Sequence, residues 1–412
     1  MKIAFLTYNR DPSIPQIDND GCPVTARNYA LQLSQKGHFI DIYVNRVIPT
    51  EESPQYIKNK FQHQQDDVLS INKKITIFRV SVNRPTSTNI PENSELSDFS
   101  EIIESVTASD YFNDRKLDQY DVVCVFHPMT MIGLLFKGYV PLKKTILFPM
   151  LLSDEYKKYQ FVSKLYIDLE TYILKEVGTI YSSSNEEKAH ILKKGVSETK
   201  VTVIPRGFDN KTFVHNIHKG ISTENIIKIV CVGSIRPQKR QDRLINVVLL
   251  LKQKGYQVEV SIIGDNKNFV KDEYIEYYNK ILNEISKHDL TDNFIFTGSL
   301  TSKEISEYFK KSDIAIFPSM AESFGKAALE SICSGVPTIL CENVFAYESF
   351  AQNNLNAVMS EDSPDAYTNA IIKLVTDPDL YFLLSKNGLN TNNEFGWDRM
   401  SDILMENLLR FE

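Results

Sequence analysis

Hydrophobic runs alternate along the chain with segments in which apolar residues recur every three or four positions. The runs predict buried strands, and the recurrence predicts amphipathic helices. In the first half, strands are predicted at 2–8, 39–44, 74–80, 120–126, 144–150 and 178–184, and helices at 25–37, 97–112, 162–177 and 185–195. Strands separated by helices of this length pair in parallel through right-handed crossovers. The first half is therefore expected to be a doubly wound α/β domain.

The same alternation restarts after 201–225, a polar stretch whose proline and glycines suit an interdomain connection. Strands are predicted at 226–233, 258–264, 293–298, 313–319 and 336–340, and helices at 240–254, 272–288, 302–310, 324–334, 365–375 and 398–411. We therefore expect two Rossmann-like domains, residues 1–205 and 206–396. Residues 54–70 and 84–96 are expected to be loops.

Composition narrows the class of protein. A chain of 412 residues is longer than one hydrophobic core usually organises, and 42% hydrophobic with 24% charged residues is ordinary for globular proteins. The net charge of −7 gives no basic surface for nucleic acid or an anionic membrane. Five scattered cysteines indicate buried thiols in a reducing compartment. With no signal-peptide pattern and no apolar run of membrane-spanning length, a cytoplasmic location is expected.

Two glutamates eight positions apart, Glu322 and Glu330, flank the predicted turn into the helix at 324–334. At ~1.5 Å per helical residue they would lie roughly 12 Å apart, which suits an extended nucleotide sugar. A carboxylate accepts hydrogen bonds from vicinal hydroxyls, so Glu322 suits the sugar and Glu330 the ribose. The alternative is that Glu322 caps the helix and Glu330 is a solvated surface residue.

Between the two glutamates, a helix N-terminus is suited to an anion. The backbone N–H groups of Phe324, Gly325 and Lys326, after Ser323, would be free to bind a diphosphate. Glycine at position 325 would permit close approach of the phosphate to the backbone.

A cationic loop is predicted after the strand at 226–233. Gly233 ends this strand, Ser234 follows, and Arg236 and Lys239 come just before the next helix. Cations there would neutralise a diphosphate leaving group, and one such contact is worth on the order of 3–4 kcal/mol of transition-state stabilisation. The alternative is an ordinary solvated cluster.

At this point the sequence resembles a known family. The stretch 317–340, FPSMAESFGKAALESICSGVPTIL, is similar to the E-x7-E signature of the retaining GT-B glycosyltransferases of glycosyltransferase family 4. VTVIPRGFD, from residue 201, resembles the interdomain element of that family, with Arg206 where asparagine is commoner. NFIFTGSL, which contains Gly298, resembles the segment that flanks the nucleotide base. The resemblance covers 1–412 and is strongest in 200–340.

The resemblance implies roles for particular residues in a donor site. Glu322 would orient the donor sugar and Glu330 the ribose, while Lys239 and Arg236 would bind the diphosphate. Backbone donors would come from Phe324, from Gly325 and from Gly21, which lies in the segment that is similar to the family's glycine loop. The C-terminal helix, within 397–412, would cross back to the first domain, whereas the alternative places it on the second.

Three departures from the family pattern stand out. Asp20 replaces the first glycine of the glycine loop and would face the acceptor, and Ser234 stands where an arginine is usual. Pro149 and Met150 stand where a histidine near the transfer centre is expected, so backbone carbonyls would serve there, with residues 153–155 facing the acceptor. His127, at the end of the preceding strand, would bind the acceptor or have only a structural role.

The function implied is transfer of a hexose, of glucose or N-acetylglucosamine type, from a nucleotide-diphosphate sugar that is expected to be UDP-linked. The acceptor hydroxyl would belong to a small molecule, a glycan or a glycolipid. No metal and no other cofactor is implied, because cations and helix dipoles would meet the phosphate charge and no Asp-x-Asp motif follows a strand. A dinucleotide oxidoreductase is disfavoured by the lack of G-x-G-x-x-G, and a non-catalytic sugar-nucleotide binder stays open.

Overall fold

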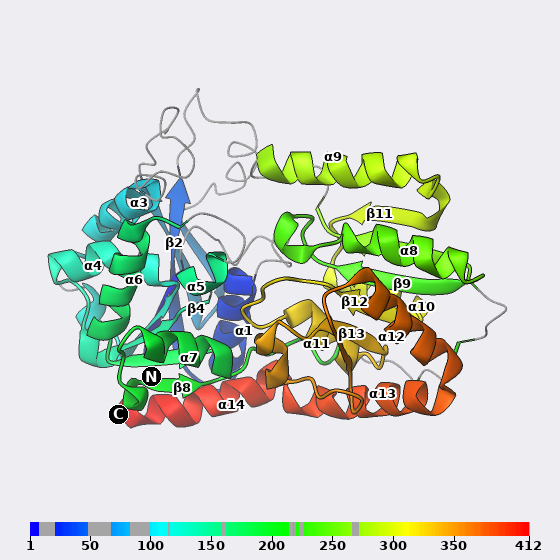
Figure 1. The fold of residues 1–412 in the computed structure, drawn as a ribbon. Coiled ribbons are helices and arrows are strands. Elements are labelled where there is room, and N and C mark those ends of the chain that lie inside the picture. The colour runs from blue at the N-terminus through cyan, green and yellow to red at the C-terminus, as the bar shows by residue number, and fades with distance from the viewer. Residues whose placement is uncertain are drawn as a thin grey trace. The chain divides into compact units, whose positions relative to one another are not determined.

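The computed structural model describes residues 1–7, 21–47, 67–82, 99–113, 116–150, 152–157, 162–213, 217, 220–221, 226–265 and 272–411. The chain divides into two compact units (Figure 1). Unit 1 comprises Met1–Arg206 with Trp397–Glu412, and unit 2 comprises Gly207–Gly396. Arg206, expected to open the second domain, thus belongs to unit 1. Each unit is an α/β domain built on one sheet.

The sheet of unit 1 has the order β3-β4-β2-β1-β5-β6-β7-β8. All neighbouring strands are parallel except β3, which runs antiparallel to β4. Its strands are β1 (Lys2–Thr7), β2 (Phe39–Val47), β3 (Val68–Asn72), β4 (Ile75–Val82), β5 (Val122–Phe126), β6 (Thr145–Phe148), β7 (Thr179–Ser182) and β8 (Val201–Val203). The order reverses between β1 and β5, as it does in doubly wound sheets.

Helices cover both faces of this sheet, so its central strands are apolar on both sides. They are α1 (Gly21–Gln35), α3 (Phe99–Ser109), α4 (Ile132–Lys137), α5 (Ser153–Tyr156), α6 (Lys164–Glu176), α7 (Asn185–Lys193) and α14 (Trp397–Leu408). One core contains Ala4 and Leu6 of β1 and lies under α3, α4, α6 and α7. The other contains Ile3 and Phe5 and lies under α1 and α14.

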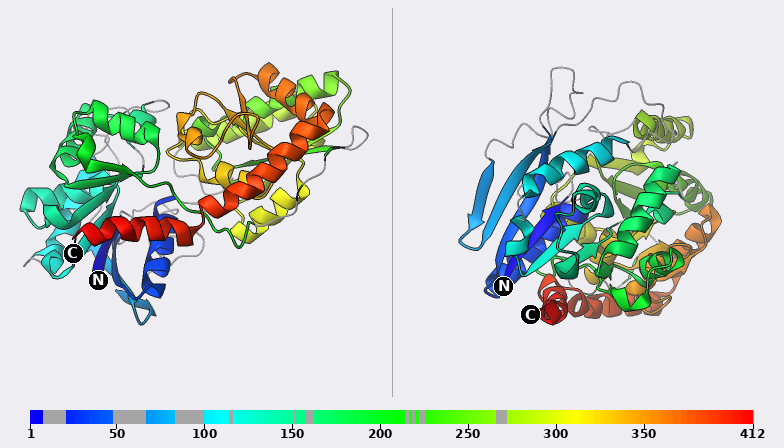
Figure 2. Two further views of the ribbon diagram at one scale, coloured as in Figure 1. Left: turned by 90° about the horizontal axis from the view of Figure 1, so that it is seen from below. Right: turned by 90° about the vertical axis from the view of Figure 1, so that its left-hand side faces the viewer.

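The C-terminal helix α14 completes unit 1 by packing against α1 (Figure 2). Trp397, at its start, is 5% exposed and meets the ring of Tyr29 edge to face, with ring centroids 5.3 Å apart. Met400, Leu404 and Leu408 repeat at helical spacing on the same buried face. This apolar stripe is buried in a core of unit 1, which explains why the last helix belongs to that unit.

The sheet of unit 2 has six parallel strands in the order β11-β10-β9-β12-β13-β14. They are β9 (Ile227–Val232), β10 (Val258–Ile263), β11 (Phe294–Gly298), β12 (Ile314–Phe317), β13 (Thr338–Cys341) and β14 (Val358–Ser360). Numbered along the chain, this is the 3-2-1-4-5-6 order of the Rossmann fold, in which the direction of strand addition across the sheet reverses between β9 and β12. Ligands of such sheets bind at the carboxyl ends of the two strands that flank this switch point.

Unit 2 also has a core on each face of its sheet. Its helices are α8 (Arg243–Gln253), α9 (Asp272–Lys287), α10 (Ser302–Lys311), α11 (Lys326–Cys333), α12 (Pro364–Thr376) and α13 (Pro378–Thr391). The core that includes residues of α8, α9 and α12 is distinct from the core that includes residues of α10 and α11. Gly388 of α13 lets this helix approach α11, because a Cβ there would lie 2.4 Å from the carbonyl oxygen of Ile332.

Several elements differ from the sequence-based expectation. β3 occupies 68–72, so the loop expected at 54–70 is wrong at its end, and β8 occupies the start of the expected connection at 201–225. β14, α4, α5 and α13 were not expected. Helix α11 begins at Lys326 instead of 324, and α1 begins at Gly21 itself. Elements of three to six residues have too few positions to show a hydrophobic period. The asparagines of α13 obscure its helical pattern in the sequence.

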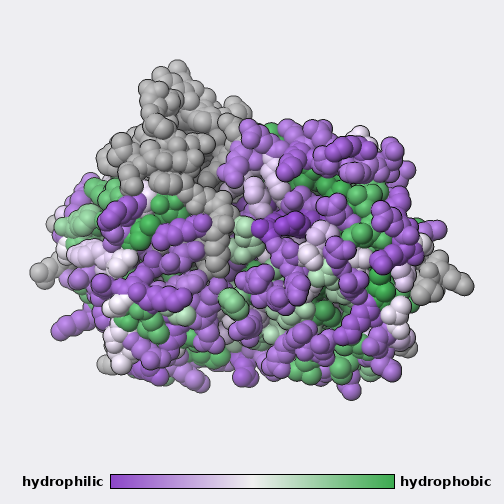
Figure 3. Space-filling view, viewed as in Figure 1, coloured by the Kyte–Doolittle hydropathy of each residue, from purple (hydrophilic) through white to green (hydrophobic). Residues whose placement is uncertain are grey.

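Two further expectations concern the surface and the thiols. Cys124, Cys231, Cys333 and Cys341 are all buried free thiols, as expected. No helix in the described part of the chain has the length and apolar character needed to cross a bilayer. On the face shown in Figure 3, hydrophilic residues predominate and hydrophobic ones are scattered.

The close approach of α13 to α11 predicts that Gly388→Ala destabilises the protein. The added methyl group meets backbone, which cannot move aside, so overpacking should cost about 1–3 kcal/mol, more than the ~1 kcal/mol gained in helix propensity. Urea unfolding measures the difference, with Lys386→Ala at an exposed position of the same helix as control. A Gly388→Ala variant as stable as this control would contradict the observed packing.

Candidate functional site

The turn after β9 brings a lysine over the end of the strand. Gly233 follows β9, and its carbonyl would lie 2.1 Å from a Cβ at Gly264, so only glycine at 264 permits this approach. A short 3-10 helix, η7 (Pro237–Lys239), follows. The aliphatic stem of Lys239 packs over Gly233, with its Cδ and Cε 3.6 Å from the position of a Cβ. The side chain of Lys239 is thereby directed back across the strand end.

The turn after β12 is tied to the turn after β9 by Gln238. The side-chain N–H of Gln238 donates to the carbonyl of Ala321 at 2.9 Å, and the backbone carbonyl of Gln238 accepts from the N–H of Met320 at 2.9 Å. Gln238 is 3% exposed, so these bonds are shielded from water. Because β9 and β12 are neighbours at the switch point, the two turns are joined where ligands of such sheets bind.

Lys239 and Glu322 meet between these turns. The Nζ atom of Lys239 lies 2.5 Å from Oε1 of Glu322, and the Ser319 hydroxyl donates to the same oxygen at 2.8 Å. The side chains are 16% and 12% exposed. Two residues predicted from separate motifs, 83 positions apart, thus form one ion pair that keeps some access to solvent. The site offers an ammonium for an anion and a carboxylate for hydroxyl groups.

The other predicted residues of the β9 turn lie beside this pair. The Nε atom of Arg236 is buried and has no hydrogen-bond partner among the described residues. Ser234 is exposed, and its carbonyl accepts a hydrogen bond from the Gln241 side chain at 3.0 Å. Gly298 ends β11, two strands from β9, and its carbonyl accepts from the N–H of Gly264 at 3.1 Å.

The start of α11 is set by Gly325, which caps the helix in the left-handed region with φ of 88°. A Cβ there would lie 2.4 Å from the ring of Tyr347. Phe324 is fully buried and packs edge to face on Phe350, so only its backbone could contact a ligand. The expected helix start at Phe324 is therefore wrong by two residues. The turn into the helix passes through a left-handed residue, which glycine adopts readily, before the helix begins at Lys326.

Glu330 is buried to a degree that the sequence did not indicate. Its side chain is 6% exposed and lies 3.0 Å from the Nζ atom of Lys326, one helical turn earlier. Burial raises the pKa of Glu330, and the Lys326 ammonium opposes this rise. Glu330 is the fifth residue of α11, so the distance of roughly 12 Å, which assumed eight helical steps, does not apply. The solvated-surface alternative is also wrong.

In unit 1, two predicted residues end neighbouring strands in an unusual conformation. His127 follows β5 with φ of 92°, and Met150 follows β6 with φ of 67°. The N–H of His127 donates to the carbonyl of Phe148 at 2.8 Å. Left-handed residues other than glycine are strained and cluster at functional sites. Gly21 is the first residue of α1, and Asp20 lies outside the described residues.

The carbonyl of Met150 is already engaged. It accepts a hydrogen bond from the Arg206 guanidinium, which uses one of the two lone pairs of this oxygen. Arg206 and Met150 both depart from the family pattern, and they contact each other. The sequence showed each departure but not the contact, because 56 residues separate them.

A buried ionic cluster that sequence reasoning missed holds the segment after β6. Glu170 is fully buried and accepts hydrogen bonds from the N–H of Ser153 at 2.8 Å and from its hydroxyl at 2.5 Å. Lys194 lies 3.0 Å from Glu170 and 2.8 Å from Asp154. Burial raises the pKa of Glu170, whereas Lys194 and Ser153 lower it. Ser153 and Asp154, expected to face an acceptor, are thus anchored to the protein.

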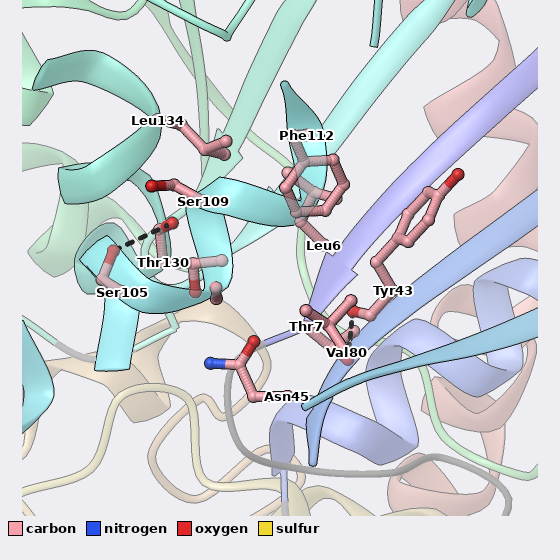
Figure 4. Close-up of a pocket in the computed structure, with 11 residues that line it drawn as sticks. Leu6, Thr7, Tyr43, Asn45, Val80, Ser105, Ser109, Phe112, Thr130 and Leu134 are labelled. Carbon is pink, nitrogen blue, oxygen red and sulfur yellow. Dashed lines mark hydrogen bonds between the residues drawn. The ribbon is translucent and has the colours of Figure 1, made fainter. Parts of the chain in front are cut away.

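A small cavity lies near the carboxyl ends of β1, β2 and β4 (Figure 4). Its volume of about 20 Å³ is enough for a water molecule. Asn45, Thr7 and Ser109 are among its polar lining residues, and Leu6 and Phe112 are among the apolar ones. Within the described residues, no group of three or more His, Cys, Asp or Glu side chains is placed to hold a metal ion.

The contact between Gly325 and Tyr347 predicts a large effect of Gly325→Ala. Gly255, with φ of 87°, is a matched control because a Cβ there has nothing within 4 Å. Both variants incur left-handed strain of about 1–2 kcal/mol, and only Gly325→Ala adds overpacking of about 1–3 kcal/mol. Chemical denaturation should show this extra loss, and equal losses would contradict the contact.

The burial of Glu330 predicts a pH-dependent stability. Because its pKa in the folded protein lies above the ordinary value of 4.5, Glu330 stays protonated to a higher pH in the folded state than in the unfolded chain. Its contribution to the free energy of unfolding is fully present below pH 4.5 and is lost as pH rises through the raised pKa. Wild type should therefore lose stability relative to Glu330→Gln over that range. Unfolding curves at a series of pH values measure this, and a difference between the two proteins that stays constant with pH would contradict the raised pKa of Glu330.

Comparison with known proteins finds a family model that matches residues within unit 2. Residues 215–391 match the family model described as "Glycosyl transferases group 1". UDP-Gal:alpha-D-GlcNAc-diphosphoundecaprenol alpha-1,3-galactosyltransferase of Escherichia coli is 26% identical over 248 residues, 57% of this chain and 61% of that protein. The match spans 61% or less of the length of the first curated relatives.

Solved structures match over nearly the whole chain. Sucrose-phosphate synthase of Thermosynechococcus elongatus superposes with a TM-score of 0.78 at 18% identity, over 99% of this chain and 98% of that one. Anabaena HepE, solved in complex with UDP-glucose, gives a TM-score of 0.69 at 14% identity, over 100% of both chains. At these identities the likeness concerns the fold. The chain has the GT-B fold of two Rossmann-like domains, and residues 215–391, which lie in its second unit, are similar to the glycosyltransferase group 1 family.

Proposed function

We propose that the protein is a retaining glycosyltransferase of family 4, which transfers a hexose of glucose or N-acetylglucosamine type from a UDP-sugar to an acceptor hydroxyl. The observation that carries this proposal is the contact between Lys239 and Glu322 at the switch point of unit 2. It puts a cation and a hydroxyl-binding carboxylate side by side where a nucleotide sugar needs both. The group 1 match of residues 215–391 supports the reaction class.

Lys239 can hold Glu322 and a phosphate at once. An ammonium has three N–H donors, of which the bond to Glu322 uses one. The remaining donors would bind the diphosphate, with Arg236 and the N–H groups near Gly325 adding positive potential. Glu322 keeps its second oxygen for the sugar hydroxyls. The ion pair would thus fix the sugar relative to its leaving group.

The proposed reaction needs no protein nucleophile. The bond between the anomeric carbon and the diphosphate oxygen breaks, and the acceptor oxygen bonds the same carbon on the same face. The acceptor proton passes to the departing phosphate oxygen. Lys239 and Arg236 would stabilise the charge that develops on that oxygen, which is the step where fixed cations lower the barrier. The proposal includes no metal or other cofactor, because these cations offset the phosphate charge.

The nucleotide of the donor and its ribose contact are proposed on different grounds. UDP is proposed because the E. coli relative and the HepE complex both carry UDP in their names. Glu330 remains the proposed ribose contact, although its 6% exposure requires a close approach. The acceptor, proposed to be a small molecule, a glycan or a glycolipid, would be bound by unit 1, with His127 and Met150 at the strand ends. A cytoplasmic location is proposed with it.

The second candidate is a sugar-nucleotide binder without catalysis. Ser234 in place of arginine and the engagement of the Met150 carbonyl by Arg206 favour it. Such a protein would bind UDP with the same residues of unit 2 and would turn over no donor.

The proposed function predicts that Lys239→Ala and Glu322→Gln each lower transfer by about 10²–10³-fold, the usual loss for one transition-state contact. The assay follows UDP release from UDP-glucose, UDP-N-acetylglucosamine and UDP-galactose with purified protein and a panel of acceptors. Lys310→Ala and Glu307→Gln, at exposed positions of α10, are matched controls and should leave the rate unchanged. Near-wild-type rates in both site variants would contradict the assignment, and UDP binding without any turnover would favour the second candidate.

A further inference from the structure

The residue after Lys239 has a backbone conformation that glycine adopts more readily. Arg240 lies in the left-handed region with φ of 52° and ends η7. Its N–H donates to the carbonyl of Pro237 at 3.2 Å, which closes the turn. A side chain with a Cβ is strained in this region, so another interaction must offset the strain.

That interaction is an ion pair with a distant part of the sheet. The Arg240 guanidinium pairs with the carboxylate of Asp362, and Nε of Arg243 lies 3.6 Å from Oδ1 of the same residue. The side chains of Arg240 and Asp362 are 22% and 18% exposed, which limits screening by solvent. Asp362 follows β14 at the edge of the sheet, whereas Arg240 follows β9 in its middle.

The buried polar atoms of this cluster depend on each other. Oδ1 of Asp362 and Nε of Arg243 are both buried, and neither has a hydrogen-bond partner in the part of the chain that the structure describes. Their mutual attraction is therefore the interaction that offsets their burial. Removing the carboxylate would leave two guanidinium groups facing each other, and the left-handed turn would lose its support.

The turn held in this way is the one that carries Lys239. On one side of Lys239, Gln238 fixes the backbone to the β12 turn. On the other side, Arg240 fixes it to the β14 loop. We propose that Arg240 and Asp362 are positioning residues, which hold the turn so that the Lys239 ammonium lies at Glu322 and at the donor diphosphate. The inference rests on the proposed function. The competing explanation is a structural link between α8 and α12.

The experiment measures UDP affinity by titration calorimetry for Asp362→Asn in three backgrounds: wild type, R240G and K239A. In wild type, Asp362→Asn should weaken UDP binding by about tenfold, a typical coupling between groups in one network. In the R240G background the turn no longer needs the carboxylate, so the change should have no further effect. In the K239A background it should also have none, because the effect acts through Lys239.

Controls separate positioning from general stability. Glu361→Gln, at the exposed neighbouring position, should leave UDP affinity and the unfolding midpoint unchanged. A purely structural link would lower the midpoint of Asp362→Asn without changing UDP affinity, and this result would overturn the proposal. Tighter UDP binding by Asp362→Asn would also overturn it, because Arg240 would then act as a phosphate ligand that Asp362 restrains.

Failure of the proposed function gives a different result. If wild type binds no UDP in calorimetry, the donor assignment fails and the positioning role fails with it. If wild type binds UDP and Lys239→Ala weakens binding, the proposed donor contact stands. Equal losses for Asp362→Asn in the wild-type and K239A backgrounds would then overturn the positioning role alone.

Discussion

The site in unit 2 depends on the ion pair between Lys239 and Glu322. A largely buried pair gains little unless further hydrogen bonds satisfy it, because desolvation opposes the attraction. Ser319 supplies one such bond, and Gln238 holds the two turns at the separation that the pair requires. The adjacency of β9 and β12 makes this possible, since their carboxyl ends lie side by side where the strand order reverses.

The balance of charge around this pair favours an anion. Arg236, Lys239, Arg240 and Arg243 lie on the turn after β9 and at the start of α8, whereas the carboxylates that pair with this group are Glu322 and Asp362. The start of α11 adds backbone donors. Glycine at position 325 leaves room there for the Tyr347 ring, which a Cβ would contact too closely. Lys326, the first residue of α11, is paired with the buried Glu330. The cations of the β9 turn therefore provide the main positive potential of the site.

Unit 1 has strained backbone just after the carboxyl ends of two strands of its own sheet. His127 and Met150 are left-handed residues at the ends of adjacent strands, and Arg206 holds the carbonyl of Met150. Glu170 and Lys194 anchor the segment that follows. Strained strand ends held by side chains from elsewhere in the fold are typical of functional sites, where the surrounding structure maintains a geometry that the local sequence alone would not adopt.

The sequence by itself determined the long elements, the repetition of the α/β pattern and the residues of the β9 and β12 turns, because apolar periodicity and turn chemistry are local properties. Strands of three to five residues at the sheet edges, such as β3, β8 and β14, carry too little pattern to be recognised. Only the tertiary structure decided the burial of Glu330 and the contacts of Arg206 with Met150 and of Arg240 with Asp362. These depend on strand order and on the packing of helices against the sheet, which bring together residues that no local period relates.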